Sequence, residues 1–403
     1  MMSTQRILVS LIFLALGTCA TAQRVWKPQI EYSGTTFFDG WSFFTDPDPS
    51  NGLVRYRDGD TAFAKGLAFW TQDGTPGIQA DGWTTLNPGE LRDSIRLHSK
   101  ALFNGGLFIA DFALMPWGCG IWPSFWTLGY GAVWPTLGEI DIVEGVQDRT
   151  NNECCSHSTP GCFTNTAPGM YSGITGNVDC DSTNGKTGCG ILSTSNVTYG
   201  EPFNLNGGGV FAMIWDERGI RMWEFDRRNI PADISNNAPT PGSWGMPMAA
   251  YDVSTCDINK YFKDNQLVLT VNLCGDWAGG TYSQTAHCPG TCAEQVANPA
   301  NLKNTIFLIN SIKVYQLAGP DEIPPPVANI RDASKNAQGM GGGRVSSNET
   351  SVGQASAVDK GRGGGRGGAG GGGGGSNNAM AVNTPCNGLL LAGVVCLVTV
   401  FCT

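Results

Sequence analysis

Basic charge, long helical patterns and membrane-length apolar runs are all scarce in this sequence of 403 residues. Its 34 acidic residues outnumber its 25 lysines and arginines, which gives a formal net charge of −9 and leaves no basic footprint for nucleic acid in the region expected to fold. No long stretch shows the spacing typical of an amphipathic helix. The apolar runs near the two chain ends, 7–16 and 389–402, both fall short of the about 20 residues that span a bilayer.

The first 22 residues have the composition of a secretory signal peptide. Arg6 precedes the apolar run 7–16, and the small residues Ala20-Thr21-Ala22 follow it as a cleavage site. We therefore expect residues 1–22 to be removed and the secreted chain to begin at Gln23. Two glycosylation sequons fit a secreted surface, although either can remain unmodified: they begin at Asn196 and Asn348.

The end of the chain has the layout of a signal for a glycosylphosphatidylinositol (GPI) anchor. Small residues at 376–379 are followed by a short spacer, 380–388, and then by the terminal apolar run 389–402. We predict attachment at Asn377 and removal of residues 378–403, which would hold the protein on the outer face of the plasma membrane. A single transmembrane helix is the competing interpretation, but the run is short for it.

Composition divides the remaining chain into a folded part and a tail. Residues 23–319 are rich in Trp, Phe and Gly and are long enough to bury the core of one all-β domain. Residues 320–377 are first proline-rich and then mostly Gly, Ser and Asn, so we expect a disordered tether. The Arg-Gly-Gly pattern at 361–368 would suggest RNA binding in a nuclear protein, but secretion argues against that function.

Cysteine usage agrees with secretion. Of the 14 cysteines, ten lie between Cys119 and Cys292, and an even number in a secreted chain predicts disulfides. We expect the neighbours Cys154 and Cys155 to pair with different partners, because bridging adjacent residues requires strained geometry. Metal binding by these cysteines with His157 is the alternative, but the spacing matches no zinc pattern well.

Six segments show the pattern of β-strands, and a turn at 216–219 between two aromatic-rich segments predicts a hairpin. The segments are Gly106 to Met115, Glu139 to Val146, Gly209 to Asp216, Ile220 to Phe225, Leu267 to Leu273 and Thr305 to Gln316. Short strands, many glycines and few helical stretches predict an all-β fold of the sandwich or jelly-roll type.

Three acids lie within an apolar, strand-forming run, Gly138-Glu-Ile-Asp-Ile-Val-Glu-Gly145. Strand alternation places Glu139 and Asp141 on one face, with apolar residues on the other. Glu144 joins that face only if the strand contains one extra residue, so we predict a β-bulge. For an arbitrary match to this short motif, a solvated strand face would be the commonest explanation.

The surrounding sequence resembles a known enzyme family. Residues 115–126 (Met-Pro-Trp-Gly-Cys-Gly-Ile-Trp-Pro-Ser-Phe-Trp), 134–138 (Trp-Pro-Thr-Leu-Gly) and 139–144 resemble the catalytic segment of glycoside hydrolase family 16, in its fungal endo-β-1,3(4)-glucanase (laminarinase-like) branch. The resemblance covers roughly residues 23–317. It implies a concanavalin A-like jelly-roll sandwich of two curved antiparallel sheets with a concave substrate cleft. Trp122 fits the core and the cleft equally well.

The resemblance also implies roles for the acids. Glu139 is expected to be the nucleophile and Glu144 the acid/base, with Asp141 holding a proton or hydrogen bond near Glu139. Retaining glycoside hydrolysis requires the two catalytic carboxyl groups to lie about 5–5.5 Å apart. No cofactor is implied; some relatives bind a structural calcium, but no ligands for it can be recognised in this sequence.

Aromatic side chains are expected to recognise the sugar, because apolar faces of glucose rings stack on flat rings. By resemblance, Trp126 and Trp134 line the cleft. Arg96, His157 and Trp277 resemble further sugar-contacting positions.

Three functions from different classes follow. The first is a secreted, surface-anchored, monomeric endo-glucanase acting on β-glucan. The second is a wall-remodelling transglycosylase, which membrane anchorage favours, although anchored crosslinking members of the family carry a shorter ExDxE motif. The third is a glucan-binding module without catalysis, but such members usually lack the glutamates that are present here as Glu139 and Glu144.

Overall fold

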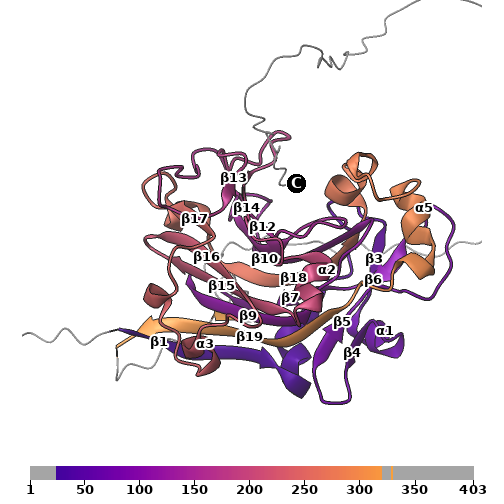
Figure 1. The fold of residues 1–403 in the computed structure, drawn as a ribbon, viewed down its shortest axis with the longest axis horizontal. Helices are drawn as coiled ribbons and strands as arrows, with labels where there is room; N and C mark the ends of the chain where they lie inside the picture. Colours follow the sequence, from indigo (N-terminus) through magenta and orange to yellow (C-terminus); the bar gives the residue numbers. More distant parts are fainter. Residues whose placement is uncertain (1–23, 320–327, 330–403) are drawn as a thin grey trace, which may run out of the picture. The chain divides into compact units, whose positions relative to one another are not determined.

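Two antiparallel sheets of eight strands each lie one over the other (Figure 1), in a computed structural model that describes residues 24–319 and 328–329. From edge to edge the first sheet contains β17 (Ala249–Asp252), β16 (Gly219–Asp226), β15 (Gly209–Asp216), β9 (Gly106–Leu114), β19 (Phe307–Ala318), β5 (Pro76–Ile78) and β4 (Ala68–Trp70), and β1 (Val25–Ser33) also pairs with β19. The second sheet contains β13 (Ile174–Thr175), β14 (Cys189–Leu192), β12 (Glu153–His157), β11 (Glu139–Glu144), β10 (Ile121–Gly129), β18 (Asn265–Leu273), β7 (Arg96–Ser99) and β2 (Trp41–Phe43).

Small elements complete the described part of the chain. Two further strand pairs are β3 (Val54–Tyr56) with β6 (Arg92–Ser94) and β8 (Ala101–Leu102) with β20 (Ala328–Asn329). The α-helices are short: α1 (Gly59–Ala64), α2 (Gly200–Leu205), α3 (Ala232–Ser235), α4 (Ile258–Tyr261) and α5 (Cys292–Ala297). Among these described helices, none has the length and apolarity required to cross a bilayer.

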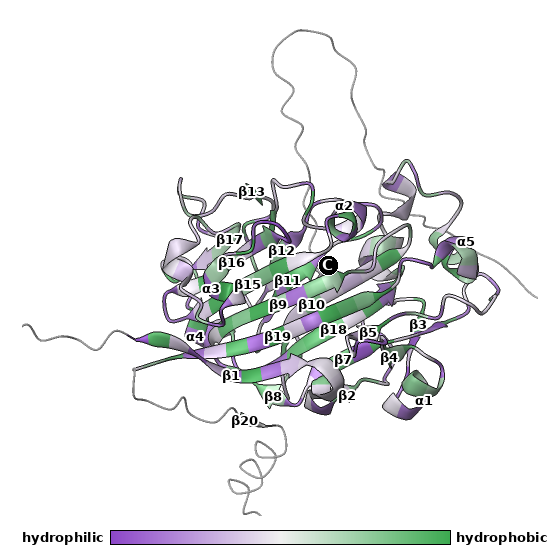
Figure 2. Ribbon diagram, turned by 60° about the horizontal axis from the view of Figure 1, so that its bottom comes forward, coloured by the Kyte–Doolittle hydropathy of each residue, from purple (hydrophilic) through white to green (hydrophobic). Residues whose placement is uncertain are grey.

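The core fills the space between the two sheets. Phe112 of β9 and Phe125 of β10 meet there with ring centroids 5.6 Å apart, and both side chains are almost completely buried. Figure 2 shows hydrophobic residues concentrated along the strands, with β18 as a clear example. The all-β jelly-roll sandwich predicted from the sequence is therefore confirmed, and the predicted hairpin is formed by β15 and β16, which pair from Gly209 with Asp226 to Asp216 with Gly219.

Alternation along β10 determines where a site can form. Phe125 points into the core, whereas Trp122, Ser124, Trp126 and Leu128 lie on the opposite face and line a cleft. The second sheet therefore has one face in the core and one face open to a ligand.

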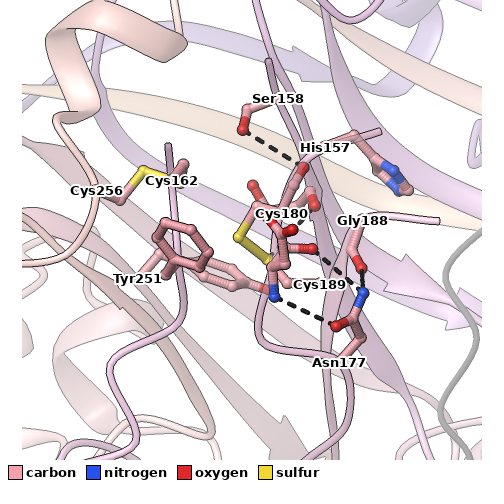
Figure 3. The surroundings of a disulfide bond; sticks show 12 residues. His157, Ser158, Cys162, Asn177, Cys180, Gly188, Cys189, Tyr251 and Cys256 are labelled. Atoms are coloured by element: carbon pink, nitrogen blue, oxygen red, sulfur yellow. Dashed lines mark hydrogen bonds between the residues drawn. A yellow bond between two sulfur atoms is a disulfide. The ribbon is translucent and has the colours of Figure 1, made fainter. Parts of the chain in front are cut away.

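Disulfides join loops to one another and to β14 and α5. The described pairs are Cys119–Cys288, Cys162–Cys256, Cys180–Cys189 and Cys274–Cys292, and Cys155 is disulfide-bonded as well. Figure 3 shows the Cys180–Cys189 bond in its surroundings, which include His157, and the Cys162–Cys256 bond in the same view. The prediction that Cys154 forms a disulfide is wrong. Cys154 is a buried free thiol, and its side chain packs in the core.

Several sequence predictions lie outside the described residues. They are the signal peptide, most of the tether, the anchor signal with Asn377, and the second sequon at Asn348. Within the tether, 328–329 are described and form β20, which pairs with β8. Residues 24–319, in contrast, all belong to one compact unit.

Candidate functional site: a row of three carboxyls in the cleft

A β-bulge in β11 brings the three acids onto one face. The pairing of β10 with β11 shifts register so that Ile142 is the extra residue without a partner on β10. The register pairs Leu128 with Glu139, Trp126 with Asp141, Phe125 with Val143 and Ser124 with Glu144. The acids thus oppose the cleft-facing positions of β10, and the predicted bulge is confirmed.

The cleft has a volume of about 300 Å³ and contains all three acids. Three tryptophans, Trp122, Trp126 and Trp134, also line it. Arg96 of β7, Thr270 and Asn272 of β18, Asp48 of a loop and Asp276 of the helical turn Gly275–Gly279 complete much of its polar surface. A carboxyl row with flat aromatic walls suits a ligand that has both hydroxyl groups and apolar ring faces.

Each of the three indole groups donates to a different acceptor. Trp134 Nε1 donates to Glu139 Oε2 at 2.7 Å, and Trp122 Nε1 donates to Glu144 Oε1 at 2.8 Å. Trp126 Nε1 donates instead to the hydroxyl of Thr270 at 3.0 Å. The two outer carboxyls of the row are therefore each oriented by a separate tryptophan.

Burial raises the pKa of Glu139 to about 8, and the neighbouring Asp141 carboxyl adds to the rise. His157, the Trp134 hydrogen bond and Arg96 act in the opposite direction by favouring the ionised form. Among the acids of the row, Glu139 thus has a set of neighbours that can stabilise its negative charge, as a nucleophilic carboxylate requires.

Burial also raises the pKa of Glu144 well above its usual value, and the charges of Asp141 and Glu139 add to that effect. The hydrogen bond from Trp122 opposes it. Glu144 is only 5% exposed, and its Oε2 makes no hydrogen bond with any described residue. This carboxyl is consequently favoured in its protonated form, and its buried Oε2 is left without a hydrogen-bond partner among the described residues.

Asp141 lies between the two glutamates and is 2% exposed. Burial raises its pKa well above the usual range, while a hydrogen bond with Glu139 acts in the opposite direction. Because carboxyls so close together cannot all ionise, a proton shared between Asp141 and Glu139 is the arrangement that burial favours.

His157 does not line the cleft, so its predicted sugar contact is corrected. It is 1% exposed, its Nε2 lies 3.3 Å from Asp141 Oδ2, and its Nδ1 lies 2.8 Å from the hydroxyl oxygen of Ser182. Burial lowers the pKa of this imidazole, which favours the neutral ring. A side chain at Gly188 would collide with the ring, since an added Cβ would lie 2.5 Å from Nδ1. His157 therefore lies against Asp141 of the carboxyl row, and Gly188 lies beside its ring (Figure 3).

Trp277 is likewise corrected to a core residue. It is 0% exposed, packs edge-to-face against Trp122 with centroids 5.9 Å apart, and has the Arg149 guanidinium 5.0 Å from its ring centroid. The sequence left Trp122 undecided between core and cleft. The structure packs its ring in a buried cluster with Val146, Trp277 and Ala278, while its N–H donates to Glu144 in the cleft.

Arg96 does line the cleft, at the edge formed by β7. Its guanidinium carbon lies 4.6 Å from the Phe44 ring centroid and 4.8 Å from the Trp126 ring centroid, and its Nε donates to His98 at 2.9 Å. It is 5% exposed, so packing holds it in one orientation. Trp134, in contrast, is 46% exposed and forms an outer wall.

Sequence reasoning missed the far wall of the cleft. Asp48 receives hydrogen bonds from the backbone of Gly52 at 2.8 Å and from the Asn272 amide at 3.0 Å, which ties a loop to β18. Asp48 and Asn272 are far apart in sequence, and neither belongs to a local motif that would have indicated the contact.

Two sets of side chains in the row have the spacing of metal ligands. Glu139, Asp141 and His157 form one set, and Asp141, Glu144 and Cys155 form the other, with candidate ligand atoms within 4.8 Å of one another. Cys155 is disulfide-bonded, so its sulfur is no thiolate ligand. Both sets contain the carboxyls whose geometry suits proton transfer.

A family model and several relatives match this chain. The model described as "XgeA-like, catalytic GH16 domain" matches residues 41–315. A probable glycosidase of Schizosaccharomyces pombe is 41% identical over 71% of this chain and 68% of its own length. A probable endo-1,3(4)-beta-glucanase of Aspergillus clavatus is 38% identical over 75% of this chain. The match spans only 48% of the Aspergillus clavatus protein.

Solved structures agree with the fold. A GH family 16 elongating beta-1,3-glucosyltransferase is 37% identical, with a TM-score of 0.68 over 72% of this chain and 100% of that one. Laminarinase 16A from Phanerochaete chrysosporium, solved with beta-glucans in donor and acceptor sites, is 35% identical with a TM-score of 0.69 over the same shares.

Proposed function

The chain belongs to glycoside hydrolase family 16, and from that membership and the geometry of its cleft we propose that it is a retaining endo-glycosidase of β-1,3 and mixed β-1,3/1,4 glucans. The observation that carries the proposal is the carboxyl row. Glu139 and Glu144 face one cleft from a single bulged strand, and each is oriented by its own indole N–H. These two environments give the two acids different tasks.

Glu139 is the nucleophile in this proposal. The Trp134 hydrogen bond and the nearby Arg96 and His157 favour its carboxylate form, and it attacks the anomeric carbon to form a glycosyl-enzyme. In this proposal Asp141 and Glu139 share one proton, which keeps the crowded row from holding three charges.

Glu144 is the acid/base. Its Oε1 is held by Trp122, so Oε2 is the oxygen that can protonate the glycosidic oxygen as that bond breaks. In the second step the same carboxylate removes a proton from water, which then releases the sugar with retained configuration.

The substrate class is inferred from the relatives and from the walls of the cleft. Curated relatives at 34–38% identity are named endo-1,3(4)-beta-glucanases, and the laminarinase structure contains beta-glucans. Trp126 and Trp134 line the same cleft as the acids, and aromatic rings can stack on glucose units.

A glucan transglycosylase is the second candidate, because the elongating beta-1,3-glucosyltransferase has a comparable similarity to this chain. The chemistry on Glu139 is the same, but Glu144 then deprotonates a sugar hydroxyl instead of water. The difference lies in which acceptor reaches the glycosyl-enzyme first.

We further propose that the enzyme is secreted and held at the cell surface by a GPI anchor at Asn377, with an N-glycan at Asn196. The signal peptide and the tail support this, and the disulfides suit an oxidising compartment. Asn196 is exposed, as a glycosylation site must be.

The test follows product masses over time when the purified protein meets an end-labelled β-1,3-glucan oligosaccharide of defined length. Only shorter products support the hydrolase, and products longer than the substrate move the assignment to the transglycosylase. Glu144→Gln should abolish both. If a panel of β-1,3 and mixed-linkage glucans all remain unchanged with the unmodified protein, the proposed function is wrong.

A further inference from the structure

The bulge leaves part of β11 without a strand partner. On one side Ile142 is the extra residue that β10 skips. On the other side the pairing with β12 runs from Glu139 with His157 to Asp141 with Cys155 and goes no further. The backbone from Ile142 to Glu144 therefore needs hydrogen-bond partners other than β12.

One side chain supplies them. The Asn152 amide Nδ2 donates to the Ile142 carbonyl oxygen at 2.9 Å, and Asn152 Oδ1 accepts from the Glu144 backbone N–H at 2.9 Å. A backbone carbonyl can only accept and a backbone N–H can only donate, so these two partners fix the orientation of the amide. Asn152 thus takes the place of a neighbouring strand across the bulge.

Asn152 is itself held rigidly. It is 0% exposed, its backbone N–H donates to the Thr198 hydroxyl at 3.1 Å, and its carbonyl accepts from the Ser193 N–H at 2.9 Å. The Cys154 thiol adds a longer contact, 3.4 Å, to the Ile142 carbonyl. The loop that carries Asn152 is therefore anchored independently of β11.

We propose that Asn152 is a positioning residue that sets the orientation of Glu144 by clamping the bulge. The inference rests on the proposed function, in which Glu144 gives and takes the proton. Without the clamp, the Glu144 backbone loses its partner and the carboxyl loses its fixed position opposite Ser124, although the Trp122 hydrogen bond remains. Fixed geometry of an acid/base group contributes strongly to its effect.

Asn152→Asp separates this role from a general structural one. In its protonated form the introduced carboxyl can still donate to the Ile142 carbonyl and accept from the Glu144 N–H. In its ionised form it can only accept, so it repels the Ile142 carbonyl oxygen and adds a charge beside Glu144. Activity should therefore be close to normal at low pH and fall as that carboxyl ionises.

Asn151→Asp is the matched control. The Asn151 amide also donates twice to backbone, to the Ser193 and Ser195 carbonyls at 2.9 and 2.8 Å, but none of its hydrogen bonds reaches β11. The same chemical change one residue away thus disturbs the loop without touching the bulge. Its pH profile should keep the unmodified alkaline limb.

The experiment measures kcat/KM against pH on a β-1,3-glucan oligosaccharide for the unmodified protein, Asn152→Asp, Asn151→Asp and Asn152→Ala. We expect Asn152→Asp to lose at least tenfold on its alkaline side relative to Asn151→Asp and to recover on acidification. Asn152→Ala should lose at least tenfold at every pH on the oligosaccharide, and clearly less on an aryl glycoside whose leaving group needs no protonation. Thermal unfolding shows whether each variant folds. If either Asn152→Asp or Asn152→Ala does not fold, the other one decides whether the inference holds.

Two results would overturn the inference while the proposed function stands. One is an Asn152→Asp profile that matches Asn151→Asp. The other is an equal loss by Asn152→Ala on both substrates, which would indicate a role that does not pass through Glu144. An inactive unmodified protein would instead count against the proposed function.

Discussion

The three cleft tryptophans allow the roles of the acids to be read separately. Each indole N–H has a different acceptor: Trp122 donates to Glu144, Trp134 to Glu139, and Trp126 to the Thr270 hydroxyl. Replacing one tryptophan by phenylalanine removes the donor but keeps an aromatic ring. The pH dependence of kcat/KM then reports which carboxyl has lost its partner.

Trp122→Phe should move the alkaline limb of the profile to higher pH. The hydrogen bond from Trp122 lowers the pKa of Glu144, so its loss raises that pKa further, and the acid remains protonated at higher pH. A hydrogen bond to a charged group contributes about 1.5–3 kcal/mol. At about 1.4 kcal/mol per pKa unit, the limb should shift by about one to two pH units, while the maximum falls because Oε1 is no longer held.

Trp134→Phe should move the opposite limb. Its hydrogen bond lowers the pKa of Glu139, which must be ionised to attack, so the acidic limb shifts to higher pH. The shift should be smaller, because Trp134 is 46% exposed and water can replace its N–H. Trp126→Phe is the matched control and should shift neither limb. The reasoning is refuted if all three variants shift the same limb or if Trp122→Phe moves the alkaline limb to lower pH.

Three further predictions concern stability and binding. The folded-state pKa of Glu139 is raised from 4.5 to about 8, so its contribution to stability is present below about pH 4.5 and is lost as pH rises toward 8. The melting temperature of Glu139→Gln relative to the unmodified protein should therefore increase by a few degrees over that interval. A constant difference between the two melting temperatures would contradict this. Trp277→Ala should lower the free energy of unfolding by about 3–5 kcal/mol in denaturant titrations, whereas Trp134→Ala should leave it nearly unchanged and raise KM. The reverse pattern would mean that Trp277 lines the cleft and is not a core residue. Replacing Cys162 and Cys256 together by serine opens a bond between residues 94 apart and should cost about 2–5 kcal/mol, measured by the same titration, with no loss expected only if the bond does not form.

Periodicity was enough to predict the fold class and the bulge. Alternation located all six predicted strands within a few residues, and the need to bring Glu144 beside Glu139 required one extra residue, which is Ile142. Strand β10 was not among the predicted strands. It contains Pro123, and proline within a run argues against a central strand. Pro123 is accommodated because the pairing of β10 with β11 begins only at Ser124 and does not include it.

Burial and long-range partners were the parts that local sequence could not supply. Trp277 and His157 were expected to contact sugar because they resemble sugar-contacting positions of the family. The fold buries both side chains instead, with Trp277 packed on Trp122 and His157 beside Asp141. An even count of cysteines cannot show that the Cys154 side chain points into the core without a disulfide partner. Asn152 carries no motif of its own, and its importance appears only once the unpaired backbone of the bulge is seen.

The central claim is that Glu139 forms a covalent bond to the sugar while Glu144 transfers the proton. It is tested most directly by incubating the protein with a β-1,3-glucan oligosaccharide that carries a fluorine at C2 and an activated leaving group, which slows breakdown of the intermediate. Peptide mass spectrometry should locate the trapped sugar on Glu139, with no adduct in Glu139→Gln. An adduct on Glu144, or no adduct together with products of inverted configuration, would contradict the account.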